Sequence, residues 1–311
     1  MDIVFAEDIR KGLTAEHKYI PDRQYYDDRG SIYFQELMAT PDYYITSSEL
    51  EIFKTYKSEL CRYFSDQTQA VNIIEFGAGD ALKTKILLSE CHRHITTRYF
   101  AIDFSKKYLS DMEVDFAKHM PQIDLHTINA DYFDALKTIP RHKSTKNIIF
   151  FIGSSLGGLL DTEFSDFFRR ITKLMTKGDL LFLGLDLKKM PETLYKAYHH
   201  TCKNWCSYLL QRINNELGGN FNLKNFEYYT TYNPEDGKFK WFFISKKPQR
   251  IHIQALNLTV DVEEGEPIYI GQSKKFSIRE INATANTYDF EIVNYFFDKN
   301  RYFANVIMEK R

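Results

Sequence analysis

Along residues 71–186, short apolar runs alternate with longer stretches of helical periodicity. The apolar runs have the length of strands and cover 71–76, 99–104, 123–128, 148–152 and 180–185. Between the last two runs, Phe164, Phe168 and Ile171 recur at the spacing of one helix face. Strands that alternate with helices predict βαβ units, and therefore an α/β fold with a doubly wound, mostly parallel sheet.

The pattern changes after this region. Residues 191–217 predict one long helix, with Pro191 in its first turn and Gly218-Gly219 at its end. Strand-like pieces follow at 226–231, 241–244, 251–253, 258–262 and 268–270. The final part predicts a helix near 277–283 and strands at 290–297 and 302–308. Such a mixture is typical of an α+β segment, with a return to the first pattern at the end.

The first 60 residues are polar and rich in tyrosine. Within them, Thr46-Ser47-Ser48-Glu49 has the pattern of a capping box, which satisfies the first free N–H groups of a helix. We therefore expect a helix to begin there and to bury Leu50, Phe53 and Leu60.

These patterns predict two domains. Residues 61–186 and 277–311 form a Rossmann-like cofactor domain, and residues 1–60 and 187–276 form an α+β domain inserted late in the sheet. Ligands of doubly wound sheets bind beyond the carboxyl ends of the strands. We expect the inserted domain to cover that edge and to bind the substrate.

Composition limits the partners and the compartment that we expect for the protein. The chain of 311 residues has a formal net charge of −1, so no global field attracts it to nucleic acid or to an anionic membrane. No apolar run approaches the roughly 18 residues of a membrane span. Four cysteines in a chain of this length do not form a disulfide scaffold. We expect a cytoplasmic monomer that acts on a small molecule, without a nucleic-acid or membrane partner.

A glycine turn directly follows the first predicted strand. Gly77 and Gly79 allow the backbone to turn tightly and to approach a ligand. Asp103 ends the second strand, roughly 20 residues further on, where dinucleotide folds place the acid that binds ribose. Asp131 and Tyr132 end the third strand and suit the amine and the face of an adenine. Together these residues predict a nucleoside-bearing cofactor.

NAD and S-adenosylmethionine (SAM) are the candidate cofactors. The third glycine that lets a helix approach a pyrophosphate is absent, because position 82 is Leu82. Glu75, directly before the glycines, disfavours a phosphate and suits the cationic methionine end of SAM. The closing strand pair fits a methyltransferase sheet, which ends in an antiparallel strand. The residues favour SAM and a Rossmann-like class I methyltransferase sheet with an inserted α+β substrate domain.

Further motifs occur at spaced positions along most of the chain. They are Tyr25–Ser31 with Phe34, Pro41–Tyr44 with Thr46 and Glu49, Glu75–Gly79 with Lys83-Thr84, Asp103, Asp131, Gly153–Gly157, Leu185–Leu187, Ala197-Tyr198 and Ala255–Asp261. With these motifs, residues 25–309 resemble the histidine-specific SAM-dependent methyltransferases of ergothioneine biosynthesis. That family trimethylates the α-amine of histidine.

The resemblance implies roles for individual residues. The expected SAM contacts are Gly77, Gly79, Lys83, Asp103, Asp131, Tyr132 and Gly153. Tyr26 and Tyr43 are the candidate catalytic residues, with Phe34 beside the reacting amine. Tyr43 and Tyr198 contact the amino acid, and Ser273 lies near its side chain. Methyl transfer is an in-line displacement, so the site mainly has to orient and desolvate a neutral amine.

Two positions depart from the family pattern. Gly158 replaces the asparagine that holds the substrate's amino-acid head, and Gly271 replaces the glutamate that reads the imidazole. Losing a buried acceptor costs roughly 1–3 kcal/mol, so we expect histidine to be a poor substrate. Trp241, with Phe242 and Phe243, would line the vacated space and favour a larger or less polar side chain. The alternative is that Gln272 or Ser273 restores the histidine contacts.

Other readings of the sequence predict different functions. Basic residues interleaved with aromatic ones over residues 238–250 suit RNA binding, but strand alternation explains them as one solvated face over one buried face. His199, Cys202 and Cys206 share a helix face, yet one face rarely completes a metal site, so we assign none. A methyltransferase for a protein or nucleic-acid amine, and a non-catalytic SAM-binding homologue, are the competing functions.

Overall fold

The computed structural model of the chain describes residues 2–142 and 144–311. These residues form two compact units. We call Ile45–Lys188 with Lys275–Arg311 the Rossmann-like unit, and the residues up to Tyr44 with Lys189–Lys274 the α+β unit. None of the described helices is long and apolar enough to cross a lipid bilayer.

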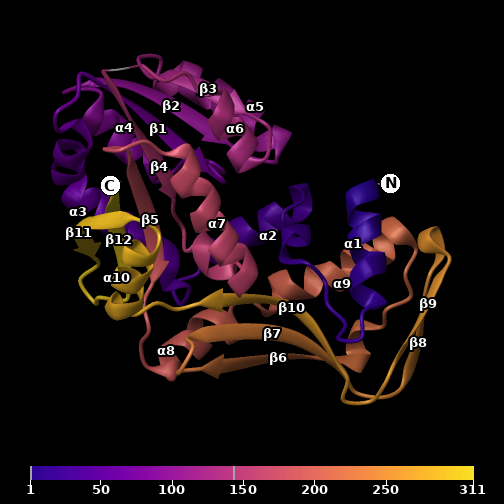
Figure 1. Cartoon of the computed structure of the whole chain (residues 1–311). Coiled ribbons are helices and arrows are strands. Elements are labelled where there is room, and N and C mark those ends of the chain that lie inside the picture. The colour runs from indigo at the N-terminus through magenta and orange to yellow at the C-terminus, as the bar shows by residue number, and fades with distance from the viewer. Residues whose placement is uncertain (1, 143) are drawn as a thin grey trace. The chain divides into compact units, whose positions relative to one another are not determined.

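A seven-stranded sheet forms the centre of the Rossmann-like unit, with the strand order β11-β12-β5-β4-β1-β2-β3 (Figure 1). Its parallel neighbours are β1 (Ala70–Phe76), β2 (Thr96–Ile102), β3 (Asp124–Ile128), β4 (Thr145–Phe151) and β5 (Leu180–Asp186). Strand β12 (Phe303–Lys310) is antiparallel both to β5 and to β11 (Phe290–Phe297). One antiparallel strand inserted beside the edge is the arrangement of class I methyltransferases, so the predicted fold class is confirmed.

Alternate strand residues face helices on the two sides of this sheet. Ile149 and Leu183 belong to the core that the sheet shares with α6 (Tyr132–Thr138), α7 (Asp161–Leu174) and α10 (Ile278–Thr287). Because successive side chains of a strand point to opposite faces, the residues between them face the other helix layer.

Helix α3 (Tyr44–Ser65) packs on that other face. The ring of Phe64 lies 5.6 Å from Phe150 and 5.5 Å from Phe182. This packing ties α3 to the sheet, so the compact units divide near residue 44 and not at the expected residue 60. The helix also begins at Tyr44, ahead of the predicted cap at Thr46.

A disulfide joins two helices of the Rossmann-like unit. Cys61 of α3 is bonded to Cys91, the last residue of α4 (Thr84–Cys91), and their Cα atoms are 5.2 Å apart. Both cysteines are buried. The bond was not predicted, because no sequence spacing marks two cysteines that only the packing of helices brings together. Cys202 and Cys206 are free and buried.

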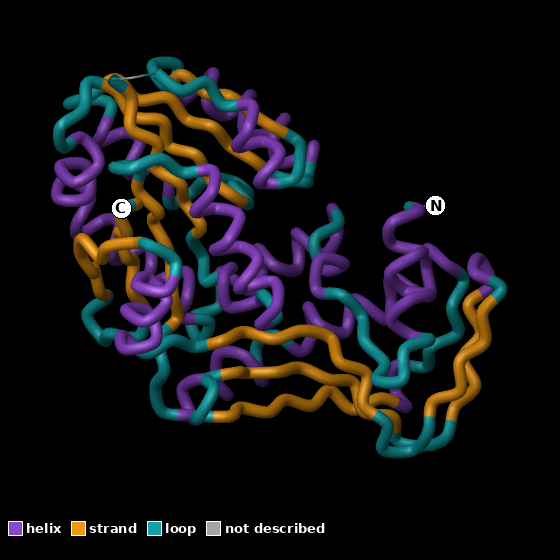
Figure 2. The backbone as a smooth tube through the Cα atoms, in the orientation of Figure 1, coloured by secondary structure: helices purple, strands orange, loops and turns teal. Residues whose placement is uncertain are grey.

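The α+β unit contains a three-stranded antiparallel sheet in the order β10-β7-β6, drawn side by side in Figure 2. The strands are β6 (Phe226–Asn233), β7 (Lys238–Ser245) and β10 (Pro267–Lys274). Strands β8 (Gln249–Ile253) and β9 (Leu258–Val262) form a separate pair. The main helices of the unit are α1 (Ile3–Leu13), α2 (Asp28–Met38) and α9 (Lys203–Leu217).

The predicted helix 191–217 is interrupted. It consists of α8 (Pro191–Tyr195), a π-helical turn at Lys196–His200, and α9, which ends at Gly218 as predicted. In the π turn, the carbonyl oxygen of Tyr198 accepts hydrogen bonds from two side chains, Tyr228 Oη at 2.9 Å and Trp241 Nε1 at 3.2 Å. The departure from α-helix thus occurs where residues of distant strands contact the backbone. The helical sequence pattern contains no information about these contacts. Such π turns are frequent at functional sites.

Candidate functional site

The glycine turn lies at the carboxyl end of β1. Gly77 has φ +71° and Gly79 has φ +54°, a left-handed conformation that favours glycine at both positions. The N–H of Gly77 donates to the carbonyl oxygen of Ile102 at 2.9 Å, which ties the turn to the end of β2. A Cβ atom added at Gly79 would meet no other atom within 4 Å. The turn therefore presents bare backbone to open space, as a cradle for a ligand requires.

Asp103 lies beside this turn. Strand β2 ends at Ile102, earlier than predicted, so Asp103 and Phe104 follow the strand. One carboxylate oxygen of Asp103 accepts from Gly79 N at 3.0 Å and the other from Ser105 N at 2.8 Å. Its side chain is half-buried. The structure thus brings together the predicted ribose-binding acid and the glycine turn.

Asp131 and Tyr132 follow β3 at the same edge. The Asp131 carboxylate caps α6 by accepting from Phe133 N at 3.0 Å, and it remains exposed. The ring of Tyr132 stacks on Phe76, with centroids 4.9 Å apart and an interplanar angle of 5°. Phe104 lies 5.6 Å from Tyr132 and is 65% exposed. Sequence reasoning placed Phe104 in the strand and so missed an exposed ring at the expected adenine position.

Lys83 is held by a carboxylate that the sequence analysis assigned to a helix cap. Glu49 of α3 forms an ion pair with Lys83, and Gly153 N donates to Glu49 Oε2 at 2.9 Å. Asn305 Nδ2 donates to Glu49 Oε1 at 2.9 Å. Glu49 is fully buried, so the capping role predicted for it is wrong. Its position on one helical face with Ile45 and Ile52 is the signal that would have revealed its burial.

Gly153 follows β4 and has φ +75°. A Cβ atom at this position would lie 3.5 Å from Lys83 Nζ. Glu49 thus connects two predicted cofactor residues, Lys83 and Gly153, to β12 through Asn305. The sequence analysis missed the contact between Glu49 and Asn305.

Glu75 is buried directly before the glycine turn. It is only 2% exposed, and it accepts a hydrogen bond of 2.5 Å from Tyr99 Oη. Burial raises the pKa of the Glu75 carboxyl to about 7. The carboxyl is bonded to Tyr99 of the neighbouring strand β2, and its place at the cationic end of SAM stays a prediction.

The arrangement fits a nucleoside with an amino-acid tail. Asp103 offers a carboxylate for ribose hydroxyls, and Tyr132 with Phe104 offers rings for a base. Lys83 is already paired with Glu49, so the described part of the turn carries no unpaired cation aimed at a pyrophosphate. The chemistry of this set suits SAM better than a dinucleotide.

A row of aromatic rings in the α+β unit contains the predicted acceptor residues. Tyr26 lies 5.6 Å from Phe34, Phe34 lies 6.5 Å from Tyr43, and Tyr43 lies 5.8 Å from Tyr198. Tyr43 and Tyr198 are buried, whereas Tyr26 is 50% exposed. The structure therefore brings all four residues together. Trp205 of α9 also contacts this row, and the sequence analysis missed it because a tryptophan in an amphipathic helix carries no special signal.

The departure at Gly271 lies beside Trp241. The two residues are paired across β10 and β7, next to a register shift, and Gly271 has φ +144°. A Cβ atom at Gly271 would lie 3.6 Å from Asp22 Cβ and 3.7 Å from Trp241 Cε3. Phe243 shares the buried face of β7 with Trp241. Phe242 lies on the other face, 5.7 Å from Tyr269, so the expectation that it lines the same space is wrong by the alternation of a strand.

The remaining predicted acceptor residues belong to different units. Ser273 is buried in β10, where it pairs with Phe239 of β7. Gly158 belongs to the Rossmann-like unit, in a short 3₁₀ turn at Ser155–Gly158. Ser273 thus lies in the same unit as the aromatic row, and Gly158 lies in the unit of the glycine turn.

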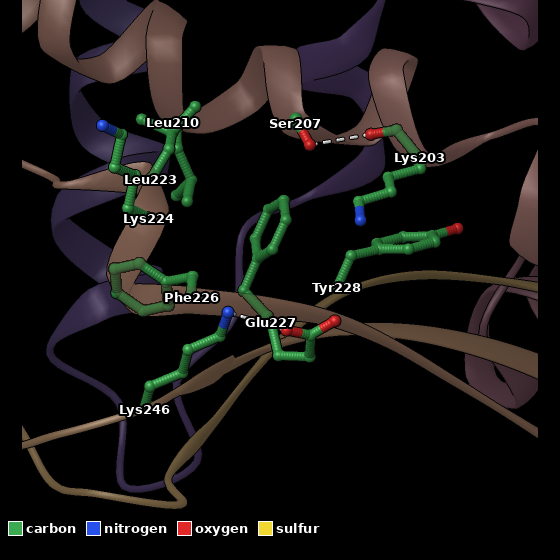
Figure 3. Close-up of a pocket in the computed structure, with 10 residues that line it drawn as sticks. Lys203, Ser207, Leu210, Leu223, Lys224, Phe226, Glu227, Tyr228 and Lys246 are labelled. Carbon is green, nitrogen blue, oxygen red and sulfur yellow. Dashed lines mark hydrogen bonds and ion pairs between the residues drawn. The ribbon is translucent and has the colours of Figure 1, made fainter.

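A cavity of about 230 Å³ opens elsewhere in the α+β unit (Figure 3). Its lining includes Lys203, Glu227, Tyr228 and Lys246, together with Phe243, which was predicted to line the acceptor space. Lys246 pairs with Glu227 at 2.8 Å. Tyr228 connects this cavity to the aromatic row, since its hydroxyl donates to the carbonyl oxygen of Tyr198.

Comparison with known proteins places these features in a family. A family model described as "Histidine-specific methyltransferase, SAM-dependent" matches residues 5–310. The histidine N-alpha-methyltransferase of Mycolicibacterium smegmatis is 28% identical, over 89% of this chain and 85% of that protein. The protein of the same name from Mycobacterium tuberculosis is 27% identical, over 90% of this chain and 87% of that protein. The L-tryptophan methyltransferase of Psilocybe serbica is 24% identical, over 86% of this chain and 82% of that protein.

Proposed function

The chain belongs to the histidine-specific, SAM-dependent methyltransferase family, and we propose that it methylates the α-amine of an amino acid or a related small amine with a side chain larger or less polar than that of histidine. SAM is the methyl donor of this family. The identity of the acceptor is the proposal, and it concerns the α+β unit.

The pair of Gly271 and Trp241 is the observation that carries this proposal. At the position where the resemblance implies an imidazole-reading glutamate, Gly271 offers no side chain, and the indole of Trp241 lies directly across the strand pair. A buried imidazole N–H without an acceptor costs roughly 1–3 kcal/mol. An indole instead offers a wide apolar face to an apolar or aromatic side chain. A relative in the family is named an L-tryptophan methyltransferase.

Two neighbouring polar residues support the competing acceptor, histidine. Gln272 and Ser273 directly follow Gly271, and both are buried. Either side chain has an oxygen that accepts a hydrogen bond. If one of them reaches the imidazole, histidine regains the partner that Gly271 cannot provide.

The chain's own residues would act by orienting the amine. In the proposed reaction, the hydroxyls of Tyr26 and Tyr43 accept hydrogen bonds from the amine N–H groups, so that its lone pair is aimed in one direction. Tyr43 and Tyr198 are buried, which removes water from around the nucleophile. SAM, when bound, supplies the electrophilic methyl group of a sulfonium. A neutral amine attacks it without a strong base, because the proton leaves to water before binding.

Asp103 and the glycine turn would hold the donor in the Rossmann-like unit. We propose that Asp103 accepts hydrogen bonds from the ribose hydroxyls, and that Gly77 and Gly79 accommodate the methionine end. Lys83 and Gly153 are positioned by Glu49, and Asp131 with Tyr132 would contact the adenine.

Steady-state kinetics with a panel of amino acids tests the acceptor. Purified protein, SAM and each amino acid in turn are incubated, and products heavier by one, two or three methyl groups are measured by mass spectrometry. We expect aromatic or large apolar amino acids to exceed histidine in kcat/KM. A kcat/KM for histidine of roughly 10⁴ M⁻¹s⁻¹ or more, above that of every other amino acid, would contradict the proposal.

A protein or nucleic-acid amine is a weaker candidate for the acceptor. The lysines of β7 alternate with the buried residues Phe239, Trp241 and Phe243. They therefore belong to the outer face of a strand, as the alternation predicted. Transfer of labelled methyl groups to total RNA or protein, in the absence of free amino acids, would favour this candidate instead.

We also propose that the protein acts as a monomer in the cytoplasm. The net charge of −1 and the proposed small acceptor require no second subunit or surface. In that reducing compartment Cys61 and Cys91 would be thiols. Alkylation of fresh lysate, followed by mass spectrometry, would reveal whether the pair is bonded in the cell.

A further inference from the structure

We propose that Trp205 is a specificity-determining residue that holds the methylated ammonium of the acceptor and thereby sets how many methyl groups are added. This inference rests on the proposed function, because it assigns the ring of Trp205 to the same amine. It concerns only residues of the α+β unit.

Trp205 lies against the rings that are expected to surround the amine. Its indole centroid is 5.2 Å from Phe34 and 5.9 Å from Tyr26. It also stacks on Tyr25, with ring centroids 4.2 Å apart. Tyr25 is buried, whereas Tyr26 is half exposed and Phe34 and Trp205 are half-buried. Trp205 is therefore backed by the core on one side and joined to partly accessible rings on the other.

The rings meet at angles that suit the walls of a cage. Tyr26 and Phe34 are inclined at 79°, and Phe34 and Tyr43 at 77°. A cation held roughly 4–5 Å from two perpendicular rings requires their centres to lie roughly 6–7 Å apart. The Phe34–Tyr43 separation is 6.5 Å. Trp205 contacts Phe34 of this pair and also Tyr26, and tryptophan is the strongest of the aromatic partners of a cation.

The two tryptophans of the chain differ in a way that supports this assignment. Trp241 is buried, and its indole N–H donates to the carbonyl oxygen of Tyr198 at 3.2 Å. The indole nitrogen of Trp205 has no hydrogen-bond partner among the described residues, although it is itself buried. Trp205 thus contacts its neighbours through its rings and, among the described residues, not through an indole hydrogen bond. A buried donor without a partner is uncommon in a native structure and requires an explanation other than hydrogen bonding.

Repeated methylation of the amine increases the importance of an aromatic ring beside it. Each transfer forms one N–C bond and breaks the S–C bond of SAM, and one proton passes to water before the next transfer. Every step therefore removes an N–H donor that could bond to Tyr26 or Tyr43. Attraction to aromatic rings does not need an N–H group and persists for a quaternary ammonium. Trp205 would accordingly matter little for the first transfer and more for the later ones.

Equilibrium binding provides a test that needs neither SAM nor turnover. The probes are glycine betaine and 3,3-dimethylbutanoate, which share a shape and a carboxylate and differ in having a charged nitrogen or a neutral carbon. We expect the wild-type protein to bind betaine more tightly, with a change in tryptophan fluorescence that survives in Trp241→Phe. Trp205→Leu should weaken betaine roughly three- to thirtyfold, while dimethylbutanoate changes little.

Turnover provides the second readout. With the best amino acid acceptor, Trp205→Leu should shift the products toward the monomethylated form, and Trp205→Phe should restore most of the fully methylated form. Phe242→Leu is the matched control. Phe242 is an aromatic residue on the face of β7 opposite to Trp241, where it contacts Tyr269. Neither Trp205 variant should alter the affinity for S-adenosylhomocysteine.

Two results would overturn the inference. One is a wild-type protein that does not distinguish betaine from dimethylbutanoate. The other is a Trp205→Leu protein with a lower melting temperature but unchanged betaine preference and product pattern, which would make Trp205 a packing residue only. If Trp205→Leu does not fold, Trp205→Phe takes its place in the binding test. A protein that methylates no amino acid would remove the proposed function, and the betaine comparison would still decide the role of the ring.

Discussion

The carboxylate of Glu49 occupies the space that a side chain at Gly184 would need. A Cβ atom added at Gly184, in the middle of β5, would lie 2.0 Å from Glu49 Oε1. Glu49 also bonds to Lys83 and Gly153. Because Gly184 has no side chain, the strand leaves room for this buried network of the predicted cofactor site.

Gly184→Ala should therefore displace Glu49 and lower the free energy of unfolding by about 1–3 kcal/mol, the usual cost of overpacking a core. Urea unfolding followed by circular dichroism measures this. The matched control is the double variant Glu49→Ala with Gly184→Ala, in which the clash is removed. If the two single effects simply add in the double variant, the contact between the two residues does not explain the loss.

Asp103→Ala should weaken binding of SAM and S-adenosylhomocysteine about tenfold or more, because hydrogen bonds to a charged group contribute roughly 1.5–3 kcal/mol. The same change removes the partner of Gly79 N. Isothermal titration calorimetry measures the affinity. Asp124→Ala, at the opposite end of the neighbouring strand β3, is the control and should bind normally. Unchanged affinity in Asp103→Ala would exclude its proposed role at the ribose.

Tyr43→Phe and Tyr198→Phe should weaken acceptor binding or turnover and leave the affinity for SAM nearly unchanged, because both residues belong to the α+β unit. Each substitution removes one hydroxyl and preserves the ring contact of 5.8 Å between the two residues. Acceptor KM and kcat, together with SAM affinity by calorimetry, separate the two roles. Equal losses of SAM affinity in both variants would refute the assignment.

Glu75 should make stability depend on pH. Burial raises its pKa in the folded protein to about 7, above the unfolded value of roughly 4.3. Between these values the folded state binds the proton more tightly. The free energy of unfolding should therefore fall as the pH rises from about 4.5 to about 7, by about 3 kcal/mol from this group.

Glu75→Gln keeps an acceptor for Tyr99 Oη and cannot ionise, so it should flatten this dependence and unfold at higher urea than the wild type at pH 8. Urea midpoints at pH 5, 6, 7 and 8 for both proteins provide the comparison. A wild-type protein that becomes more stable over this range, with no effect of Glu75→Gln, would show that the carboxyl ionises without cost.

The sequence pattern was sufficient for the strands of the Rossmann-like unit, because β1, β4 and β5 are buried on both faces and stand out as continuous apolar runs. It was also sufficient for the end of α9, where only a left-handed glycine continues the chain. The sequence also indicated that Asp103 lies near the glycine turn, because the carboxyl ends of parallel strands meet at one edge.

The errors occurred where distant residues decide a local structure. Nothing near Tyr198 shows that its carbonyl oxygen meets Tyr228 and Trp241, so the π turn could not be read from a helical pattern. Glu49 matched a capping box by residue type, and its partners Lys83, Gly153 and Asn305 lie far along the chain. Trp205 could be found only once the helix that carries it was placed beside Phe34.

The position of β12 has a consequence for synthesis of the chain. This strand, which ends at Lys310, lies between β5 and β11, and the whole segment Lys189–Lys274 is made between β5 and β12. While a ribosome is still translating residue 300, β5 has no partner on one edge, and that edge is an open template for another chain. Late pairing of distant strands is slow and prone to aggregation. The nascent protein therefore exposes this edge of β5 until β12 has been made, and a ribosome stalled before that point would present a ligand for chaperones.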